Sequence, residues 1–182
     1  MKQLILLVAF LFVTSLFPKN TYAVTNAASS AALTPVTIGA KETEDYRVKA
    51  LSNVFKKYNS PLEPYASAYV QAADKYGVDW RLLPSISGLE SSFGVHLMPN
   101  SYNAYGWGGG HIYFKNWEDG IDHINKTLKA NYMEKWGATN VWEIGPIYAE
   151  SPTWSVRVNR FMEEINSEYL AVSAKQALTP NL

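Results

Sequence analysis

Apolar residues recur at steps of three and four along much of the chain, which is the spacing that gathers side chains on one face of an α-helix. The clearest example is the series Leu82, Ile86, Leu89 and Phe93. Together with the turn residues between such stretches, the pattern predicts six helices. They cover residues 42–58, 65–76, 79–94, 116–128, 140–144 and 153–169.

Polar and turn-forming residues mark the ends of these helices. Gly77 is expected to stop the second helix in a left-handed conformation, and Asp79 and Asn116 are expected to cap the next two. Gly145-Pro146 should end the short fifth helix. Residues 99–114 are rich in Gly, Asn and Tyr and predict a loop or a small irregular hairpin. The expected fold is mainly α, with this loop facing the helices.

The N-terminal stretch has the order of a secretory signal. A short positive start, Met1-Lys2-Gln3, precedes 14 mostly apolar residues at 4–17, and Thr21-Tyr22-Ala23 offers small residues for cleavage. An uncleaved anchor is the alternative, although the apolar run is shorter than the roughly 20 residues of a membrane span. We therefore expect an exported protein, located in the periplasm or outside the cell, or tethered to the membrane if the signal is kept.

The remaining chain divides by composition. We expect an Ala/Ser/Thr-rich linker at 24–41, an N-terminal helical extension at 42–63, one domain at 64–170 and a tail at 171–182. Beyond residue 23 the chain carries 14 basic and 16 acidic side chains, which argues against nucleic acid as a partner. It has no cysteine, and its three histidines match no metal-ligand spacing. No cofactor or metal is predicted, and a monomer is expected.

Glu90 is the strongest candidate for chemistry. A glycosidase needs a carboxylic acid that keeps its proton near neutral pH until it reaches the leaving oxygen. Glu90 follows Leu89 at the predicted edge of the core and lies near a helix C-terminus, where exposed carbonyls disfavour a negative charge. The alternative is an ordinary surface glutamate. Small neighbours such as Gly88 and Ser92 favour the chemical interpretation, because they leave room for another molecule.

Four segments resemble one family of enzymes. Residues 88–94, Gly-Leu-Glu-Ser-Ser-Phe-Gly, are similar to the Glu-Ser motif that lytic transglycosylases and cell-wall glucosaminidases share within the lysozyme-like superfamily. Residues 103–107, 114–121 and 148–154 then resemble three further glucosaminidase segments, in the same order. The similarity covers roughly residues 64–168.

This resemblance implies a lysozyme-like helical domain with a substrate groove that cleaves β-1,4 bonds of peptidoglycan or a related N-acetylglucosamine glycan. Glu90 matches the general acid of the family, and Tyr148 matches a tyrosine that lines the cleavage site. Asn103, Tyr105 and Trp107 match the segment that forms the groove floor. The same segments contain the other residues expected to contact glycan, namely Ser91, Glu150 and Trp154.

A departure from the family leaves the reaction open. Many glucosaminidases have a second acidic residue between the catalytic Glu and the Asn segment, but residues 91–102 contain none. The substitutes are Glu118, Asp119, Asp122 and Glu150, of which Glu150 is the closest to Tyr148 in sequence. Without a second carboxylate, Glu90 alone would suit a lytic transglycosylase. A glycan-binding module without turnover, or an accessory protein that binds peptide, are the non-enzymatic alternatives.

Overall fold

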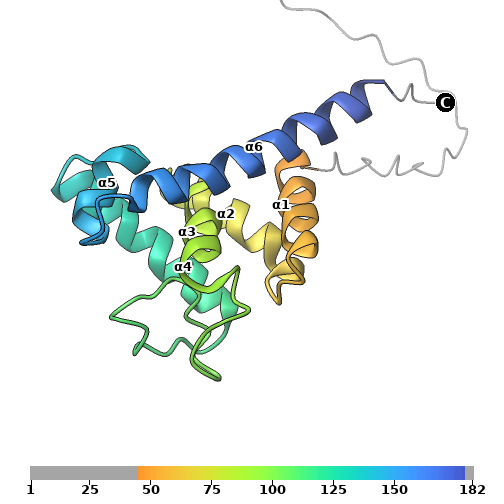
Figure 1. Ribbon diagram of the computed structural model, residues 1–182. Helices are drawn as coiled ribbons and strands as arrows, with labels where there is room; N and C mark the ends of the chain where they lie inside the picture. The colour runs from red at the N-terminus through yellow and green to blue at the C-terminus, as the bar shows by residue number, and fades with distance from the viewer. Residues whose placement is uncertain (1–44, 179–182) are drawn as a thin grey trace, which may run out of the picture. The chain divides into compact units, whose positions relative to one another are not determined.

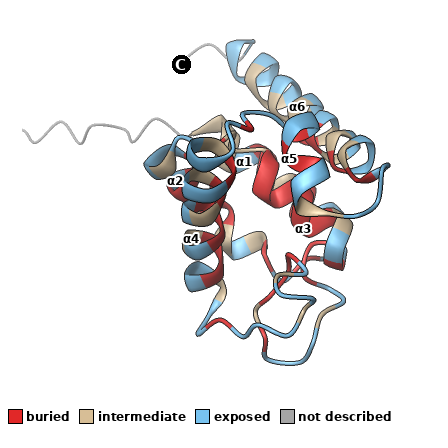
Figure 2. Cartoon of the chain, turned by 90° about the vertical axis from the view of Figure 1, so that its left-hand side faces the viewer, coloured by how far each residue is buried: buried red, intermediate tan, exposed pale blue. Residues whose placement is uncertain are grey.

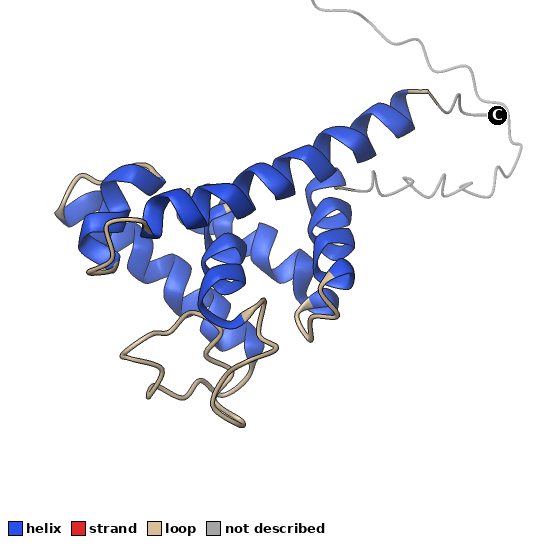
Figure 3. Cartoon of the chain, viewed as in Figure 1, coloured by secondary structure: helices blue, strands red, loops and turns tan. Residues whose placement is uncertain are grey.

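The structure is a computed structural model that describes residues 45–178. The predicted signal and linker, the first three residues of the predicted first helix and residues 179–182 lie outside the described residues. Within residues 45–178 the chain is helical, with connecting loops and no strand (Figure 3). The predicted mainly α class is therefore confirmed.

Six α-helices and two shorter helical segments follow one another along the described chain (Figure 1). They are α1 (Tyr46–Lys57), the 3₁₀ turn η1 (Glu63–Tyr65), α2 (Ala66–Tyr76), α3 (Leu82–Ser91), α4 (Trp117–Thr127), the π-helical η2 (Leu128–Lys135), α5 (Val141–Tyr148) and α6 (Trp154–Ala177). Residues 92–116 form a loop that connects the lower ends of α3 and α4 in Figure 1.

Side-chain caps explain where α1, α4 and α5 begin. Asp45 accepts a hydrogen bond from the Arg47 N–H, so α1 begins at Tyr46. Asn116 caps α4 as predicted, by accepting from the Asp119 N–H at 2.8 Å. Asp79 accepts from the Arg81 N–H at 3.0 Å, but the helix proper begins only at Leu82. Gly77 ends α2 with φ of +65°, as its position predicts.

The third helix ends earlier than its apolar spacing suggests. We expected it to reach Gly94, but it ends at Ser91, and both Ser92 (φ +52°) and Phe93 (φ +58°) are left-handed. The turn directs the Phe93 ring back into the core, where it is fully buried 5.7 Å from the Phe55 ring and 5.2 Å from the Phe161 ring. Burial of an aromatic side chain, about 2 kcal/mol or more, offsets the conformational cost of about 1–2 kcal/mol per left-handed residue.

The fifth helix ends later than predicted. We expected Gly145-Pro146 to end it, but α5 continues to Tyr148. Gly145 is buried, and a Cβ at this position would overlap the Ser155 Oγ, so the glycine permits close packing of α6. That Oγ donates to the Val141 carbonyl at 2.9 Å. Tyr148 is thus the last residue of a helix and does not lie in the non-helical stretch that the sequence suggested.

α6 packs against α1, α3 and α5, while α2 packs against α4. Figure 2 shows α3 at the centre of the buried residues, and eight of its ten residues are buried. α1, expected as an extension ahead of the domain, contributes Leu51, Val54 and Phe55 to the same core. α6 continues to Ala177, so residues 171–177 are helical although we had assigned them to a tail. None of the described helices combines the length and apolar character of a membrane span.

A pair of buried tyrosines joins α2 to the loop. The Tyr69 and Tyr105 hydroxyls lie 2.9 Å apart, and both side chains are almost completely buried. Burial is the main cause that raises the pKa of both phenols above the usual value. Ionisation of either phenol in the folded protein would leave a charge in the core, so the folded state favours the neutral form.

We expect this pair to make stability fall at alkaline pH. A raised pKa in the folded state means that the contribution is complete below about pH 10, the value in the unfolded chain, and decreases as pH rises further. Each such phenol costs about 1.4 kcal/mol per pH unit in this range. The measurement is urea unfolding at pH 8, 10 and 11. A Tyr69→Phe/Tyr105→Phe variant should show a shallower loss, and an identical loss would contradict the assignment.

Candidate functional site

Glu90 lies on the last turn of α3, between the start of α6 and the loop. The Trp154 indole N–H donates to Glu90 Oε1 at 2.9 Å. On the other side, a Cβ at Gly106 would lie 3.1 Å from Glu90 Oε2, so the loop backbone approaches this oxygen closely. The residue as a whole is exposed, which contradicts the expectation of a partly desolvated side chain. Glu90 is therefore accessible to solvent, while its Oε1 is held by the hydrogen bond from Trp154.

Trp154 connects this carboxylate to the aromatic residues behind it. It is the first residue of α6, its side chain is buried, and its ring stacks on Tyr148 with centroids 4.6 Å apart and planes 25° apart. The Tyr148 hydroxyl donates to the Tyr105 carbonyl at 2.8 Å. The chain of contacts therefore joins α3, α6, α5 and the loop through Glu90, Trp154, Tyr148 and Tyr105.

Tyr148 is half-buried beside the carboxylate, and its environment keeps the phenol neutral. Burial raises the pKa of Tyr148 well above its usual value, and the negative charge of Glu90 raises it further. The rings of Trp107 and Tyr132 each lie 6.0 Å from the Tyr148 ring. Trp107 is half-buried, while Tyr132 is buried under Tyr148. An aromatic surface thus adjoins Glu90 on the side of α5 and the loop.

Three residues that we expected to contact substrate are instead buried in the structure of the loop. Ser91 Oγ lies 2.8 Å from the Ala104 carbonyl and accepts from the Gly94 N–H at 2.8 Å, which ties the end of α3 to the loop. Tyr105 is fully buried against Tyr69. Ser91, Tyr105 and also Trp154 are buried in the described structure, although the sequence placed them among the residues expected to contact glycan.

Asn103 is the third of these buried residues, and it organises the tip of the loop. Its Oδ1 accepts from the Trp107 N–H at 3.0 Å, and its Nδ2 donates to the Trp107 and Ile112 carbonyls at 2.9 Å each. These bonds satisfy backbone groups that no regular secondary structure pairs. Asn103 therefore fixes the position of Trp107 and does not itself face a ligand.

The candidates for a second carboxylate are mostly engaged elsewhere. Asp119 accepts from the Lys115 N–H at 3.1 Å at the start of α4, and Glu118 lies in the same first turn. Asp122 pairs with Lys75 at 2.6 Å and with the Tyr76 hydroxyl. Glu150 is exposed between α5 and α6, where it lines a pocket of about 400 Å³ with Pro146 and Pro152.

No family model matches this chain, and no curated protein matches it. The candidate site is therefore identified from the structure alone. Among residues 45–178, no group of three or more His, Asp or Glu side chains is arranged to hold a metal ion. The structure brings together Glu90, Trp107, Tyr148 and Trp154, while no hydrogen bond within the described part of the chain joins Glu150 to any of them.

Two contributors were not predicted from the sequence. Tyr132 lies on η2, and only the packing of this π-helical segment brings its ring under Tyr148. Gly106 has φ of +64° and approaches Glu90 Oε2, which a larger residue would hinder. The Gly-rich run after Tyr105 indicated a turn there, but it did not indicate that the turn would reach the carboxylate.

We expect Gly106→Ala to displace the Glu90 carboxylate. Its left-handed φ makes alanine cost about 1–2 kcal/mol of stability, and the added Cβ presses on Oε2. Gly77→Ala is a matched control, because Gly77 has φ of +65° and nothing within 4 Å of its added Cβ. In ¹H–¹⁵N spectra the indole resonance of Trp154 should shift in Gly106→Ala and stay in place in Gly77→Ala. Equal shifts in both would indicate that Gly106 does not touch the site.

Proposed function

We propose that this protein cleaves the glycan strands of bacterial cell wall, in an endo-β-N-acetylglucosaminidase-type hydrolysis of β-1,4 bonds with Glu90 as general acid. The observation that carries the proposal is the exposed Glu90 carboxylate, held at one oxygen by the Trp154 indole, whose ring stacks on Tyr148. The proposal includes a lysozyme-like helical fold with a substrate groove along this surface.

The hydrogen bond from Trp154 distinguishes the two oxygens of Glu90. An indole N–H is only a donor, and the unprotonated oxygen of a carboxylic acid is a better acceptor than its hydroxyl oxygen. Oε1 therefore acts as acceptor, and the proton of the acid form belongs on Oε2. Oε2 lies next to Gly106, at the edge of the loop. From this position the proton would pass to the glycosidic oxygen of a strand that lies over the loop, as general acid catalysis requires.

The aromatic side chains beside Glu90 fit a glycan. A sugar ring has apolar faces that pack on aromatic rings, and ligand sites combine such surfaces with a few polar groups. Trp107 and Tyr148 are both half-buried with their rings 6.0 Å apart, so part of each ring stays accessible. Tyr148 acts here through its ring and through its support of Trp154, because its hydroxyl already donates to the Tyr105 carbonyl.

A second candidate reaction is lytic transglycosylation with a single carboxylate. The carboxylates of Asp119 and Asp122 are already bound to neighbouring groups at α4. This favours a reaction that needs no second carboxylate. In this reaction the 6-hydroxyl of the muramic acid attacks its own first carbon, and Glu90 first gives a proton to the leaving oxygen and then accepts one. Hydrolysis would instead need a base for water, for which Glu150 is the remaining candidate. Export from the cytoplasm, with cell wall as the partner, belongs to the same proposal.

We expect Glu90→Gln to abolish release of sugars from purified peptidoglycan while the protein stays folded. Glutamine keeps the shape and the acceptor oxygen for Trp154 but cannot deliver a proton of the required acidity. Mass spectrometry of the products distinguishes reducing N-acetylglucosamine ends from anhydromuramic ends. Glu163→Gln, an exposed glutamate on α6, is the matched control. Full activity of Glu90→Gln would overturn the assignment, and binding to cell wall without release by the parent protein would indicate a glycan-binding module.

We expect Trp154→Phe to lower kcat by about 10–100-fold with little change in KM. The variant keeps a ring to stack on Tyr148 but loses the N–H bond to Glu90, and hydrogen bonds to charged groups contribute about 1.5–3 kcal/mol. Trp142→Phe, at an exposed tryptophan on α5, is the control. A change in KM alone would show that Trp154 binds substrate and does not position the acid.

A further inference from the structure

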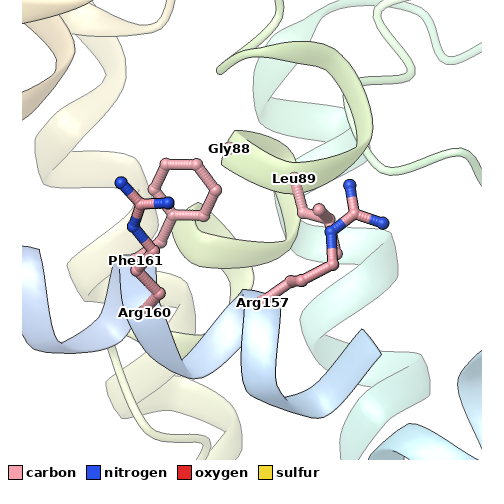
Figure 4. Close-up of a pocket in the computed structure, with 5 residues that line it drawn as sticks. All are labelled: Gly88, Leu89, Arg157, Arg160 and Phe161. Atoms are coloured by element: carbon pink, nitrogen blue, oxygen red, sulfur yellow. The ribbon is translucent and has the colours of Figure 1, made fainter. Parts of the chain in front are cut away.

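A second pocket lies beside the candidate acid, between α3 and α6. It has a volume of about 290 Å³ and is lined by Gly88, Leu89, Arg157, Arg160 and Phe161. Figure 4 shows Arg157 and Arg160 leaving α6, one beside Leu89 and the other beside Phe161, with Gly88 above them. Gly88 allows α3 to pack closely on two aromatic rings, because an added Cβ would lie 2.7 Å from the buried Phe93 ring and 3.2 Å from the Phe161 ring.

The two arginines are exposed, and neither guanidinium has a hydrogen bond or an ion pair with any residue of the described chain. The acid four positions beyond Arg160 is Glu164, but its carboxylate bonds to Lys57 and the Tyr58 hydroxyl instead. Four positions beyond Arg157 is Phe161, which carries no charge. Two positive charges therefore flank this pocket without a hydrogen bond or an ion pair to any side chain in residues 45–178.

The pocket is close to the site of the proposed reaction. Leu89 in its wall directly precedes Glu90, and Arg157 lies three residues beyond Trp154 on α6, a rise of roughly 4.5 Å along the helix. A ligand bound at Glu90 would need only a short branch to reach the guanidiniums.

We propose that this pocket binds a carboxylate that the glycan strand carries on a side branch. This inference rests on the proposed function, since it names the part of that substrate that α6 would recognise. Guanidinium groups match the planar carboxylate with two parallel N–H bonds, and the apolar floor of Leu89 and Phe161 suits the aliphatic part of such a branch. In peptidoglycan the carboxylate has two sources, the lactyl group of muramic acid and the peptide attached to it.

Binding of three soluble strands to the full chain tests the proposal. They are peptide-bearing glycan strands, the same strands after an amidase has removed the peptide and exposed the lactyl carboxylate, and chitin oligomers, which carry no carboxylate. The Glu90→Gln variant serves as the parent, so no strand is cut during calorimetry. We expect at least one carboxylate-bearing strand to bind about tenfold or more tightly than the chitin oligomer, and the preferred strand identifies the source.

In the Glu90→Gln background, Arg157→Gln/Arg160→Gln should bring the ratio of the affinity for the preferred carboxylate-bearing strand to the affinity for the chitin oligomer close to one. Arg157→Lys/Arg160→Lys should restore only part of it, because an ammonium keeps the charge but lacks the planar fork. Lys49→Gln/Lys56→Gln, at two exposed lysines on α1, controls for the loss of two positive charges and should keep the ratio of the parent. An unchanged ratio in the double Gln variant, or no preference in the parent, overturns the proposal. Competition by inorganic phosphate as strong as that by the carboxylate strands overturns it as well.

The test separates failure of this inference from failure of the proposed function. Affinity is measured without turnover. A carboxylate preference that depends on the arginines therefore stands even if the protein with its unchanged sequence releases no sugar from peptidoglycan. Conversely, cleavage that depends on Glu90, with no role for the arginines in binding, leaves the proposed reaction in place and removes only the carboxylate pocket.

Discussion

The contact between the Trp154 indole and the Glu90 carboxylate determines how the parts of this domain are arranged around its candidate site. Trp154 is buried at the first position of α6, stacks on the end of α5 and donates to the end of α3. Ser155 beside it approaches Gly145 so closely that only glycine fits there. Displacement of Trp154 would therefore disturb three helix ends at once, together with Glu90, the candidate acid.

The periodicity of apolar residues was sufficient to predict the helices, because each helix buries one face. The pattern mispredicted the ends of helices where a local conformational preference competed with tertiary packing. The spacing of Leu89 and Phe93 suggested a continuous helix, but Phe93 is buried through a left-handed turn that periodicity does not describe. Pro146 suggested an end to α5, although the helix continues past it. Within the site, the position of Glu90 followed from its motif, whereas its exposure and its partner Trp154 depend on contacts between distant residues.

Residues that resemble a functional motif divide here into two groups. Ser91, Asn103 and Tyr105 are buried and satisfy or support the loop backbone, so their role is to shape the surface. Glu90 and Trp107 stay accessible at that surface. The division has a physical reason: a loop of about 25 residues without regular structure needs side-chain partners for its backbone groups, and polar residues of a motif supply them.

The left-handed turn at Ser92 and Phe93 also bears on the order in which the protein folds. This turn is locally unfavourable, and its compensation comes from Phe55 and Phe161, which lie far away in sequence on either side. It becomes stable only after α1 and α6 have both docked, which requires closure of long loops. We therefore expect this turn, which directly follows the helix end that carries Glu90, to reach its native conformation late in folding.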